Sequence, residues 1–219
     1  MMKFLLFTAM TPLAGGLIKL NARDRSRTAG NQNMSKEEKS PLAVAENIWV
    51  IKYPLTLLGL EFGRTVTLVR LASGEMVIHS TAPFTASDIA AIRRVGEPAW
   101  LLDATLFHDS FAQEGQRAFS ELPYLAPQGF SKVSAVNTSP LVPAPAEWVG
   151  ELDVLPLAGM PKCREHLFFH RPSRTLIVCD CLFNFGKMPS KWTRFFLRNV
   201  MRLRDGIGMS AFFRFLIRD

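Results

Sequence analysis

Short apolar runs separated by turn residues dominate the hydrophobic pattern of this chain. The runs are rich in aromatic and β-branched residues, and pairs such as Ser73-Gly74 lie between them. This pattern is typical of β-strands, and Ser73-Gly74 fits the tight turn of a hairpin. We expect strands at residues 45–53, 66–71, 75–79, 99–102, 124–126, 151–157, 167–169 and 175–179.

Helical signals interrupt the strands in the first half of the chain. Thr85 or Ser87 is expected to cap a helix that runs to Arg94, with Asp88 in its first turn, where a carboxylate is favoured. A second helix is expected at residues 110–119, and the three prolines of residues 137–146 predict an irregular loop there. Helices and strands alternate early and strands dominate late. The order predicts an α+β fold, an αββα sandwich with a two-sheet core and helices on both sides.

The last predicted hairpin ends in an acidic residue. Residues 167–169 and 175–179 flank the turn Arg171-Pro172-Ser173, and Asp180 follows at the end of the second strand. A buried carboxylate needs a partner, because an unpaired buried charge is costly. The expected partners are an arginine (Arg174 or Arg70), the start of the next helix, or a metal ion.

The composition fits one domain whose basic charge lies at its two ends. The chain has 219 residues, 48% of them apolar, and a formal charge of +7. Residues 187–219 contain eight basic and two acidic residues, and residues 1–40 contain seven and three, which leaves the body slightly acidic. A nucleic-acid groove across the core is therefore not expected.

Three cysteines, Cys163, Cys179 and Cys181, favour a reduced, cytoplasmic protein. Residues 1–40 are interpreted as a disordered or non-native extension that precedes a domain at residues 41–219. The apolar run at residues 4–18 also resembles a signal peptide, but no clean cleavage site follows it. Met34 is an alternative start of the chain.

The C-terminal segment, residues 190–203, is predicted to be helical and amphipathic. Its apolar residues recur at helical spacing and are expected to pack on the sandwich, leaving the basic row solvated. The sharper alternative is a surface that binds an anionic membrane or an acidic protein partner. The basic row consists of Lys191, Arg194, Arg198 and Arg202, and the apolar face of Trp192, Phe195, Phe196, Val200 and Leu203.

Several blocks resemble the metallo-β-lactamase superfamily. Cys179-Asp180-Cys181-Leu182-Phe183-Asn184 is similar to the segment that carries its metal-bridging Asp, with Cys179 in place of the usual Gly. More closely, residues 45–219 resemble a mostly bacterial family of unknown function with a metallo-β-lactamase-like core. The blocks that carry this second resemblance are Thr67 to Gly74, His79-Ser80, Phe107-His108, Trp148 to Glu151, and Phe168 to Leu176 followed by Asp180.

The resemblance implies a zinc site that this sequence does not complete. Superfamily hydrolases use a His-x-His-x-Asp-His motif, but residues 103–110 read Asp-Ala-Thr-Leu-Phe-His-Asp-Ser. The later His position falls near Lys162 or Cys163. The family pattern also continues beyond Arg218-Asp219 and supplies a last His, so the resemblance predicts a domain that lacks its C-terminal part. In that case the aromatic residues within 212–216 are expected to be an exposed remnant of the truncated domain.

Residues at predicted strand ends could still form a metal site with fewer ligands than the superfamily site. Asp180, His108, Asp109 and His79 suffice for one Zn²⁺ or Fe²⁺ ion. The structural alternatives are that His79 caps a loop, that Asp109 is the N-cap of the helix at 110–119, and that Asp180 pairs with an arginine. His166 and His170 are expected on the sheet surface, paired with Glu165. No resident cofactor is the favoured prediction.

Two functions of different class follow. The favoured one is a non-catalytic binding or scaffold protein, and the alternative is a metal-dependent hydrolase with a mononuclear site, acting on an ester, thioester or similar substrate.

Overall fold

The computed structural model describes residues 3–6, 40–57, 59–184, 190–203 and 207–217. Fifteen strands, five α-helices and two further short helices are present in these residues. The helices are α1 (Ala86–Val95), α2 (Ala112–Ala118), α3 (Phe130–Ser134), the 3-10 helix η2 (Ala146–Trp148), α4 (Lys191–Phe195), the π-helix η3 (Phe196–Val200) and α5 (Ala211–Leu216).

Two sheets stacked face to face form the core. The seven-stranded sheet has the order β10 (Ser139–Pro140), β9 (Tyr124–Ala126), β8 (Glu97–Leu102), β7 (Glu75–His79), β6 (Arg64–Arg70), β3 (Ile48–Tyr53), β2 (Leu42–Ala45). The four-stranded sheet has the order β1 (Lys3–Leu6), β13 (Thr175–Val178), β12 (His166–His170), β11 (Leu152–Pro156). Two small ribbons pair β4 (Thr56–Leu57) with β5 (Leu60–Glu61), and β14 (Phe183–Asn184) with β15 (Ile207–Gly208).

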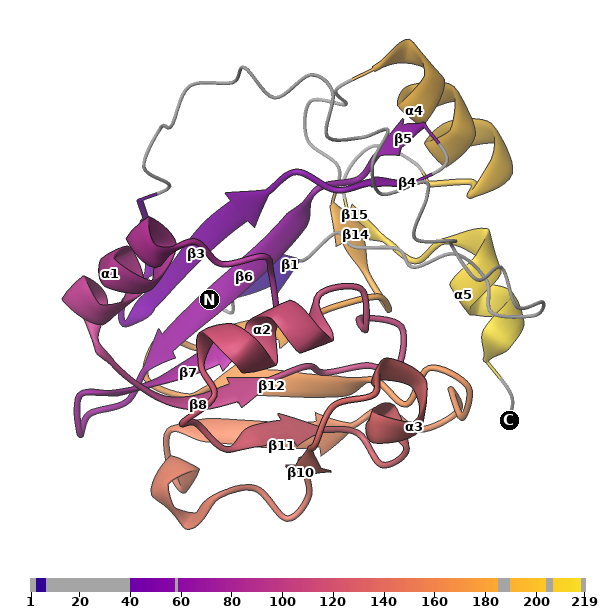
Figure 1. Ribbon diagram of the computed structural model, residues 1–219. Helices are drawn as coiled ribbons and strands as arrows, with labels where there is room; N and C mark the ends of the chain where they lie inside the picture. Colours follow the sequence, from indigo (N-terminus) through magenta and orange to yellow (C-terminus); the bar gives the residue numbers. More distant parts are fainter. Residues whose placement is uncertain (1–2, 7–39, 58, 185–189, 204–206, 218–219) are drawn as a thin grey trace.

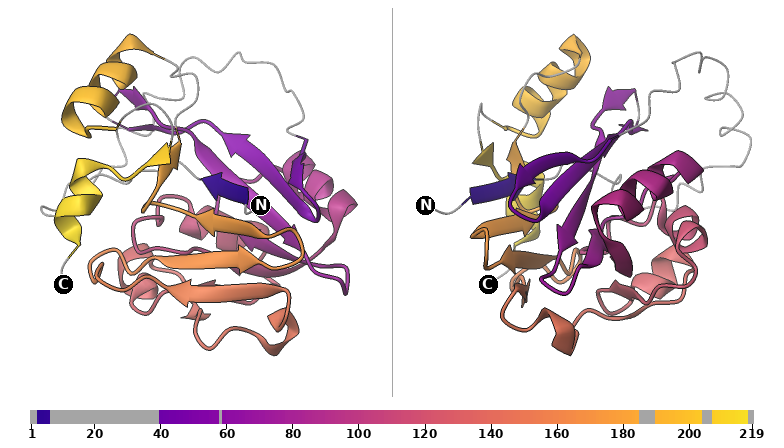
Figure 2. Two further views of the ribbon diagram at one scale, coloured as in Figure 1. Left: turned by 180° about the vertical axis from the view of Figure 1, so that it is seen from behind. Right: turned by 90° about the vertical axis from the view of Figure 1, so that its left-hand side faces the viewer.

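Helices α1, α2 and α3 cover the outer face of the seven-stranded sheet (Figures 1 and 2). Side-chain alternation on β7 explains both of that sheet's interfaces, because successive residues of a strand point to opposite faces. Val77 belongs to the apolar cluster between the two sheets, together with Trp148 and Phe168. Met76 and Ile78 belong to the cluster under the helices. The predicted sandwich is confirmed in its two-sheet core and this helical layer.

Local signals place most elements close to the predicted positions. Thr85, not Ser87, caps α1: its hydroxyl accepts from the Asp88 amide at 3.2 Å, and its own amide donates to the Asp88 carboxylate at 2.9 Å. The strand expected at residues 45–53 is confirmed as β3 over residues 48–53. It begins later than expected, because Asn47 adopts a left-handed conformation (φ 57°) and Ala45 belongs to the separate strand β2. The loop expected at residues 137–146 contains the short strand β10, which pairs with β9.

Within the N-terminal extension, residues Lys3–Leu6 form β1, which pairs in parallel with β13. Residues 7–39, including most of the signal-like run, lie outside the described residues.

The C-terminal segment packs at one end of the sandwich, and it buries only part of the predicted face. Leu203 is buried and Phe196 packs against the same apolar cluster, whereas Val200 is exposed. Thr193, Leu197 and Met201 are buried, whereas Trp192 and Phe195 are exposed. The helical region also ends at Val200, earlier than expected. Among the described residues, no helix is long and apolar enough to cross a membrane.

The strand ends bring the predicted site residues to one edge of the sandwich. Strands β7 and β8 run in parallel, with His79 opposite Leu102, so their carboxyl ends lie at the same edge. Asp103 follows β8 directly, and Cys179 and Asp180 follow β13. The chemistry-bearing residues from both sheets therefore converge there.

Candidate functional site

His108 and Asp180 meet in the buried space between the sheets. His108 lies in the segment between β8 and α2, and its Nε2 atom is 3.2 Å from Oδ1 of Asp180. Both side chains are at most 1% exposed. The alternative arginine partners are not used: Arg70 donates to the Asn47 side chain and the Val95 carbonyl oxygen, and Arg174 is exposed in the hairpin turn.

Glu165 holds the end of β13 in place. Its carboxylate accepts the backbone amides of Cys179 at 2.8 Å and of Asp180 at 3.2 Å. Burial, and then the charge of Asp180, raises the pKa of Glu165 to about 8, although the two amides lower it. At neutral pH the Glu165 carboxyl is therefore mostly protonated, because a second buried negative charge beside Asp180 is unfavourable.

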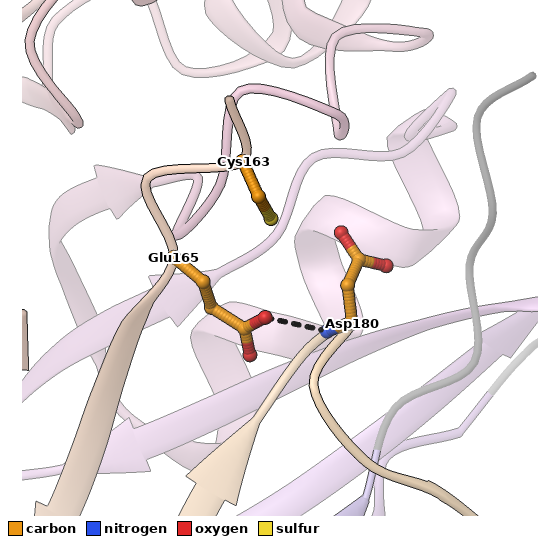
Figure 3. A group of neighbouring side chains, drawn as sticks. All are labelled: Cys163, Glu165 and Asp180. Atoms are coloured by element: carbon orange, nitrogen blue, oxygen red, sulfur yellow. Dashed lines mark hydrogen bonds between the residues drawn. The ribbon is translucent and has the colours of Figure 1, made fainter. Parts of the chain in front are cut away.

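Cys163, Glu165 and Asp180 form a compact group of possible metal ligands (Figure 3). One donor atom from each lies within 4.8 Å of the others, and all three residues are buried. Cys163 belongs to the loop between β11 and β12, where its Sγ atom lies 3.0 Å from the Thr105 hydroxyl. Burial, followed by the nearby carboxylates, raises the pKa of the Cys163 thiol.

An ion pair fills the neighbouring part of the same edge. Arg64 of β6 donates to Oδ1 of Asp103 at 3.0 Å and to the Thr81 carbonyl oxygen at 2.9 Å. Asp103 also accepts the Tyr124 hydroxyl at 2.6 Å and the Thr81 hydroxyl at 2.8 Å. Arg64 and Asp103 are 2% and 0% exposed. The charges are therefore compensated by the protein's own groups.

His79 is a buried, neutral side chain. Its Nε2 atom lies 3.9 Å from the sulfur of Cys179, and its ring packs edge-on against Phe168. Burial, then the charges of His108 and Arg64, lowers the pKa of His79 to about 3. His79 is thus a buried neighbour of the site.

Asp109 lies beside this site but does not cap α2. The N-cap is Phe111, and Asp109 contributes only its backbone oxygen, which accepts the Ala112 amide at 3.1 Å. Burial raises the pKa of the Asp109 carboxyl, which is half-buried. The predicted N-cap role of its side chain is therefore wrong.

His166 and His170 do not pair with Glu165. The Nδ1 atom of His170 hydrogen-bonds the Ser173 hydroxyl at 2.7 Å, and Nδ1 of His166 lies 3.0 Å from the Arg164 carbonyl oxygen. His170 is buried rather than on the sheet surface. Glu165 instead turns inward to the end of β13, because two backbone amides there need an acceptor.

A cavity of about 630 Å³ adjoins the site. Its walls are mainly apolar and come from the loops after β9, β10 and β11. The cavity lining includes one buried acidic residue, Glu165. Lining residues include Pro127, Leu141, Val142, Met160, Arg164 and Glu165.

The four residues predicted from the sequence, Asp180, His108, His79 and Asp109, lie near one edge of the sandwich, and the sequence reasoning did not single out Glu165 or Arg64. Whether any of the four binds a metal stays a prediction. Cys163 carried a signal, since the resemblance placed the later His near Lys162 or Cys163. Arg64 carried none, because it lies at the start of a strand with no motif around it.

No protein-family model and no curated protein matches this sequence. The structure is similar to that of DIM-1 metallo-β-lactamase exposed to ceftazidime, with a TM-score of 0.51 and 16% identity over 69% of this chain and 72% of that chain. It is similar to TMB-1, with a TM-score of 0.54 and 12% identity over 81% and 93% of the two chains. VMB-1 aligns with a TM-score of 0.50 and 12% identity over 63% and 68%. The chain thus has a metallo-β-lactamase-like fold, and identities this low establish the fold alone.

Proposed function

We propose that this chain is a non-catalytic binding or scaffold protein on a metallo-β-lactamase-like fold. The supporting observation is the closed state of the site. Cys163, Glu165, Asp180 and His108 are at most 1% exposed and contact one another or backbone amides. A catalytic metal needs several ligands and an open position for water or substrate, and of these four residues only Glu165 lines the adjoining cavity.

The replaced histidine positions support the same proposal. Where the superfamily motif has its histidines, this chain has residues such as Thr105, whose hydroxyl donates to the Cys163 carbonyl oxygen at 3.2 Å. The Arg64–Asp103 pair supplies a permanent buried cation at the same edge. The Arg64 guanidinium donates to four acceptor atoms, on Thr81, Asp103 and His108. It therefore stabilises this edge without an exchangeable ligand.

A second function, a metal-dependent hydrolase with a single ion, is favoured by a different observation. Oδ2 of Asp180 is buried and accepts no hydrogen bond within the described part of the chain. Together with Cys163 and Glu165, it offers a sulfur and oxygen donor set that fits Zn²⁺ or Fe²⁺. Such an ion would act as a Lewis acid and lower the pKa of a bound water.

The non-catalytic proposal is preferred because two of these donors are poorly disposed to ligate. Glu165 already accepts two backbone amides, and the sulfur of Cys163 lies 3.0 Å from the Thr105 hydroxyl, so protein groups already engage both donors. We also propose a reducing, cytoplasmic setting, which the three free and buried cysteines support.

Hydrolysis assays on the full chain test this choice. Wild type and Asp180→Ala are incubated with Zn²⁺ or Fe²⁺ and offered a chromogenic β-lactam, an aryl ester and a thioester. The proposal predicts equal, background rates for both proteins. Turnover by wild type that is lost in Asp180→Ala, with both proteins folded by circular dichroism, would establish the hydrolase instead.

A further inference from the structure

Aromatic side chains occupy the outward side of the C-terminal helix. Trp192 and Phe195 are 55% and 53% exposed, and their rings stack with centroids 5.9 Å apart. A helix turns by about 100° per residue. Trp192 and Phe195 therefore lie away from Thr193 and Leu197, which are fully buried. The apolar rings point to solvent while a threonine points inward.

The orientation of this helix is fixed by specific contacts. The Thr193 hydroxyl accepts the backbone amide of Glu61 in β5 at 3.1 Å and the Ser190 hydroxyl at 2.9 Å. Leu197 packs into an apolar cluster with Met201 and Phe213 of the same end of the molecule. Rotating the helix to bury its aromatic rings would break these contacts, so the rings are presented outward.

Basic residues surround the exposed rings. Lys191 and Arg194 are exposed beside Trp192 and Phe195, and Arg198 lies one turn further on. Glu61 contacts the helix through its backbone amide, and its side chain is exposed. We call the set Lys191, Trp192, Arg194, Phe195 and Arg198 the aromatic–basic face.

Exposed apolar side chains gather at this end of the protein. Six of the eleven exposed large hydrophobic residues in the described ranges fall in residues 192–217, and these six include every exposed aromatic ring among them. Phe215 of α5 is the most exposed, at 84%. Figure 1 shows α4 and α5 at the same end of the molecule, with α4 at an outer corner. Such concentrations of exposed apolar surface mark interaction sites.

We propose that the aromatic–basic face binds the surface of an anionic phospholipid bilayer. This proposal rests on the proposed binding function and names its partner. Tryptophan and phenylalanine favour the headgroup region, where an amphipathic ring meets both water and acyl chains. Lysine and arginine beside them are attracted to anionic headgroups.

The shape and charge of the face favour a bilayer over an acidic protein. Trp192 and Phe195 are exposed on α4, and α4 lies at an outer corner of the molecule, where a flat surface can reach it (Figure 1). The cations flank the rings on the same helix, so both can meet one flat anionic surface together. This charge complementarity selects anionic over neutral lipid.

Vesicle binding with tryptophan fluorescence tests the proposal. The chain has four tryptophans, and among them Trp192 is the exposed one, while Trp100 and Trp148 are buried and Trp49 is half-buried. Vesicles of phosphatidylcholine with phosphatidylserine are expected to shift the emission to the blue, and vesicles of phosphatidylcholine alone to leave it unchanged. The blue shift is expected to vanish in Trp192→Phe while co-sedimentation with the anionic vesicles persists.

Charge variants sharpen the test. Lys191→Gln/Arg194→Gln is expected to lower the partition coefficient about 30-fold, because each basic residue near an anionic surface contributes about fivefold. Lys132→Gln on α3, an exposed cation elsewhere on the protein, is the matched control and is expected to change it little. Binding is also expected to weaken as salt rises.

Three results would overturn the proposal: no preference for anionic vesicles, equal loss of binding in Lys132→Gln, or binding to soluble polyglutamate without any Trp192 shift on vesicles. The last would assign the face to an acidic protein partner. None of these readouts involves metal or turnover, so failure here leaves the non-catalytic proposal standing, and a hydrolase result leaves lipid binding standing.

Discussion

His108 and Asp180 are 72 residues apart in sequence, and their side chains meet at 3.2 Å between the two sheets. The contact joins the loop after β8 of the larger sheet to the end of β13 of the smaller one. Both side chains are buried, so the contact is shielded from solvent. The contact thus links the two sheets at the edge of the fold where the candidate site residues lie.

The Glu165 carboxyl predicts a loss of stability as the pH rises. Its pKa is raised from 4.5 to about 8 in the folded protein, so folded Glu165 keeps a proton that unfolded Glu165 releases. This contribution is complete below pH 4.5 and is lost as the pH rises to about 8. The free energy of unfolding is expected to fall by up to about 1.4 kcal/mol per pH unit in that window.

Urea denaturation at a series of pH values measures this slope. Glu165→Gln is expected to flatten it, whatever the cost of the substitution at any single pH. Glu147→Gln, an exposed carboxyl elsewhere, serves as the control and is expected to keep the wild-type slope. An unchanged slope in Glu165→Gln would contradict the assignment.

The Arg64–Asp103 pair predicts strong coupling between two buried charges. Arg64→Met is expected to cost about 3 to 5 kcal/mol of stability, because it leaves the Asp103 carboxylate buried without its cation. Arg64→Met/Asp103→Asn removes the second charge but keeps an acceptor for the Tyr124 and Thr81 hydroxyls. The double variant is therefore expected to be more stable than Arg64→Met in chemical denaturation. A double variant that is less stable than Arg64→Met would show that the unpaired Asp103 charge does not cause the loss of stability in Arg64→Met.

His79 predicts sensitivity to acid. Its folded pKa of about 3 lies below the unfolded value of 6.5, so the unfolded chain takes up a proton in this window and the folded chain does not. Stability is therefore expected to fall as the pH drops below 6.5, with a slope of up to about 1.4 kcal/mol per pH unit. His79→Gln is expected to remove this slope from equilibrium unfolding curves. His166→Gln is expected to change it less, because His166 is only partly buried. Equal slopes in wild type and His79→Gln would refute the buried neutral state.

The strands were predictable because their signals are local. The runs 66–71 and 75–79 are rich in apolar and β-branched residues and flank a Ser-Gly turn. The structure contains them as β6 and β7, respectively. The break between β2 and β3 was missed although Glu46 and Asn47 interrupt the apolar run there, and Asn47 adopts φ 57°. Asparagine tolerates this conformation, but its presence does not require it.

The buried face of the C-terminal helix could not be predicted from hydrophobicity alone. Hydrophobicity favours burying Trp192 and Phe195, but the hydroxyl of Thr193 meets an amide of β5 at this end of the fold. That contact involves residues 132 positions apart, which no local pattern reports.

The candidate site was partly predictable from the positions of its residues relative to the strands. Asp180 and His108 lie beyond the ends of strands β13 and β8, and residues at strand ends gather at the rim of a sandwich, so sequence position was informative. Their direct contact was not predicted, because Arg174 and Arg70 were the expected arginine partners of Asp180. Arg70 is engaged by Asn47 and the end of α1, a tertiary arrangement.

Metal content tests the central claim, that this edge of the fold is closed by the protein's own groups, most directly. Wild type, Asp180→Ala and Cys163→Ser are purified without chelator or His-tag, exposed to excess Zn²⁺ or Fe²⁺, desalted and measured by mass spectrometry. Cys163→Ser keeps the test informative where Asp180→Ala folds poorly. The account predicts no stoichiometric metal in any of the three proteins. About one ion per wild-type chain, lost in Asp180→Ala and reduced in Cys163→Ser, would contradict it and establish a mononuclear metal site.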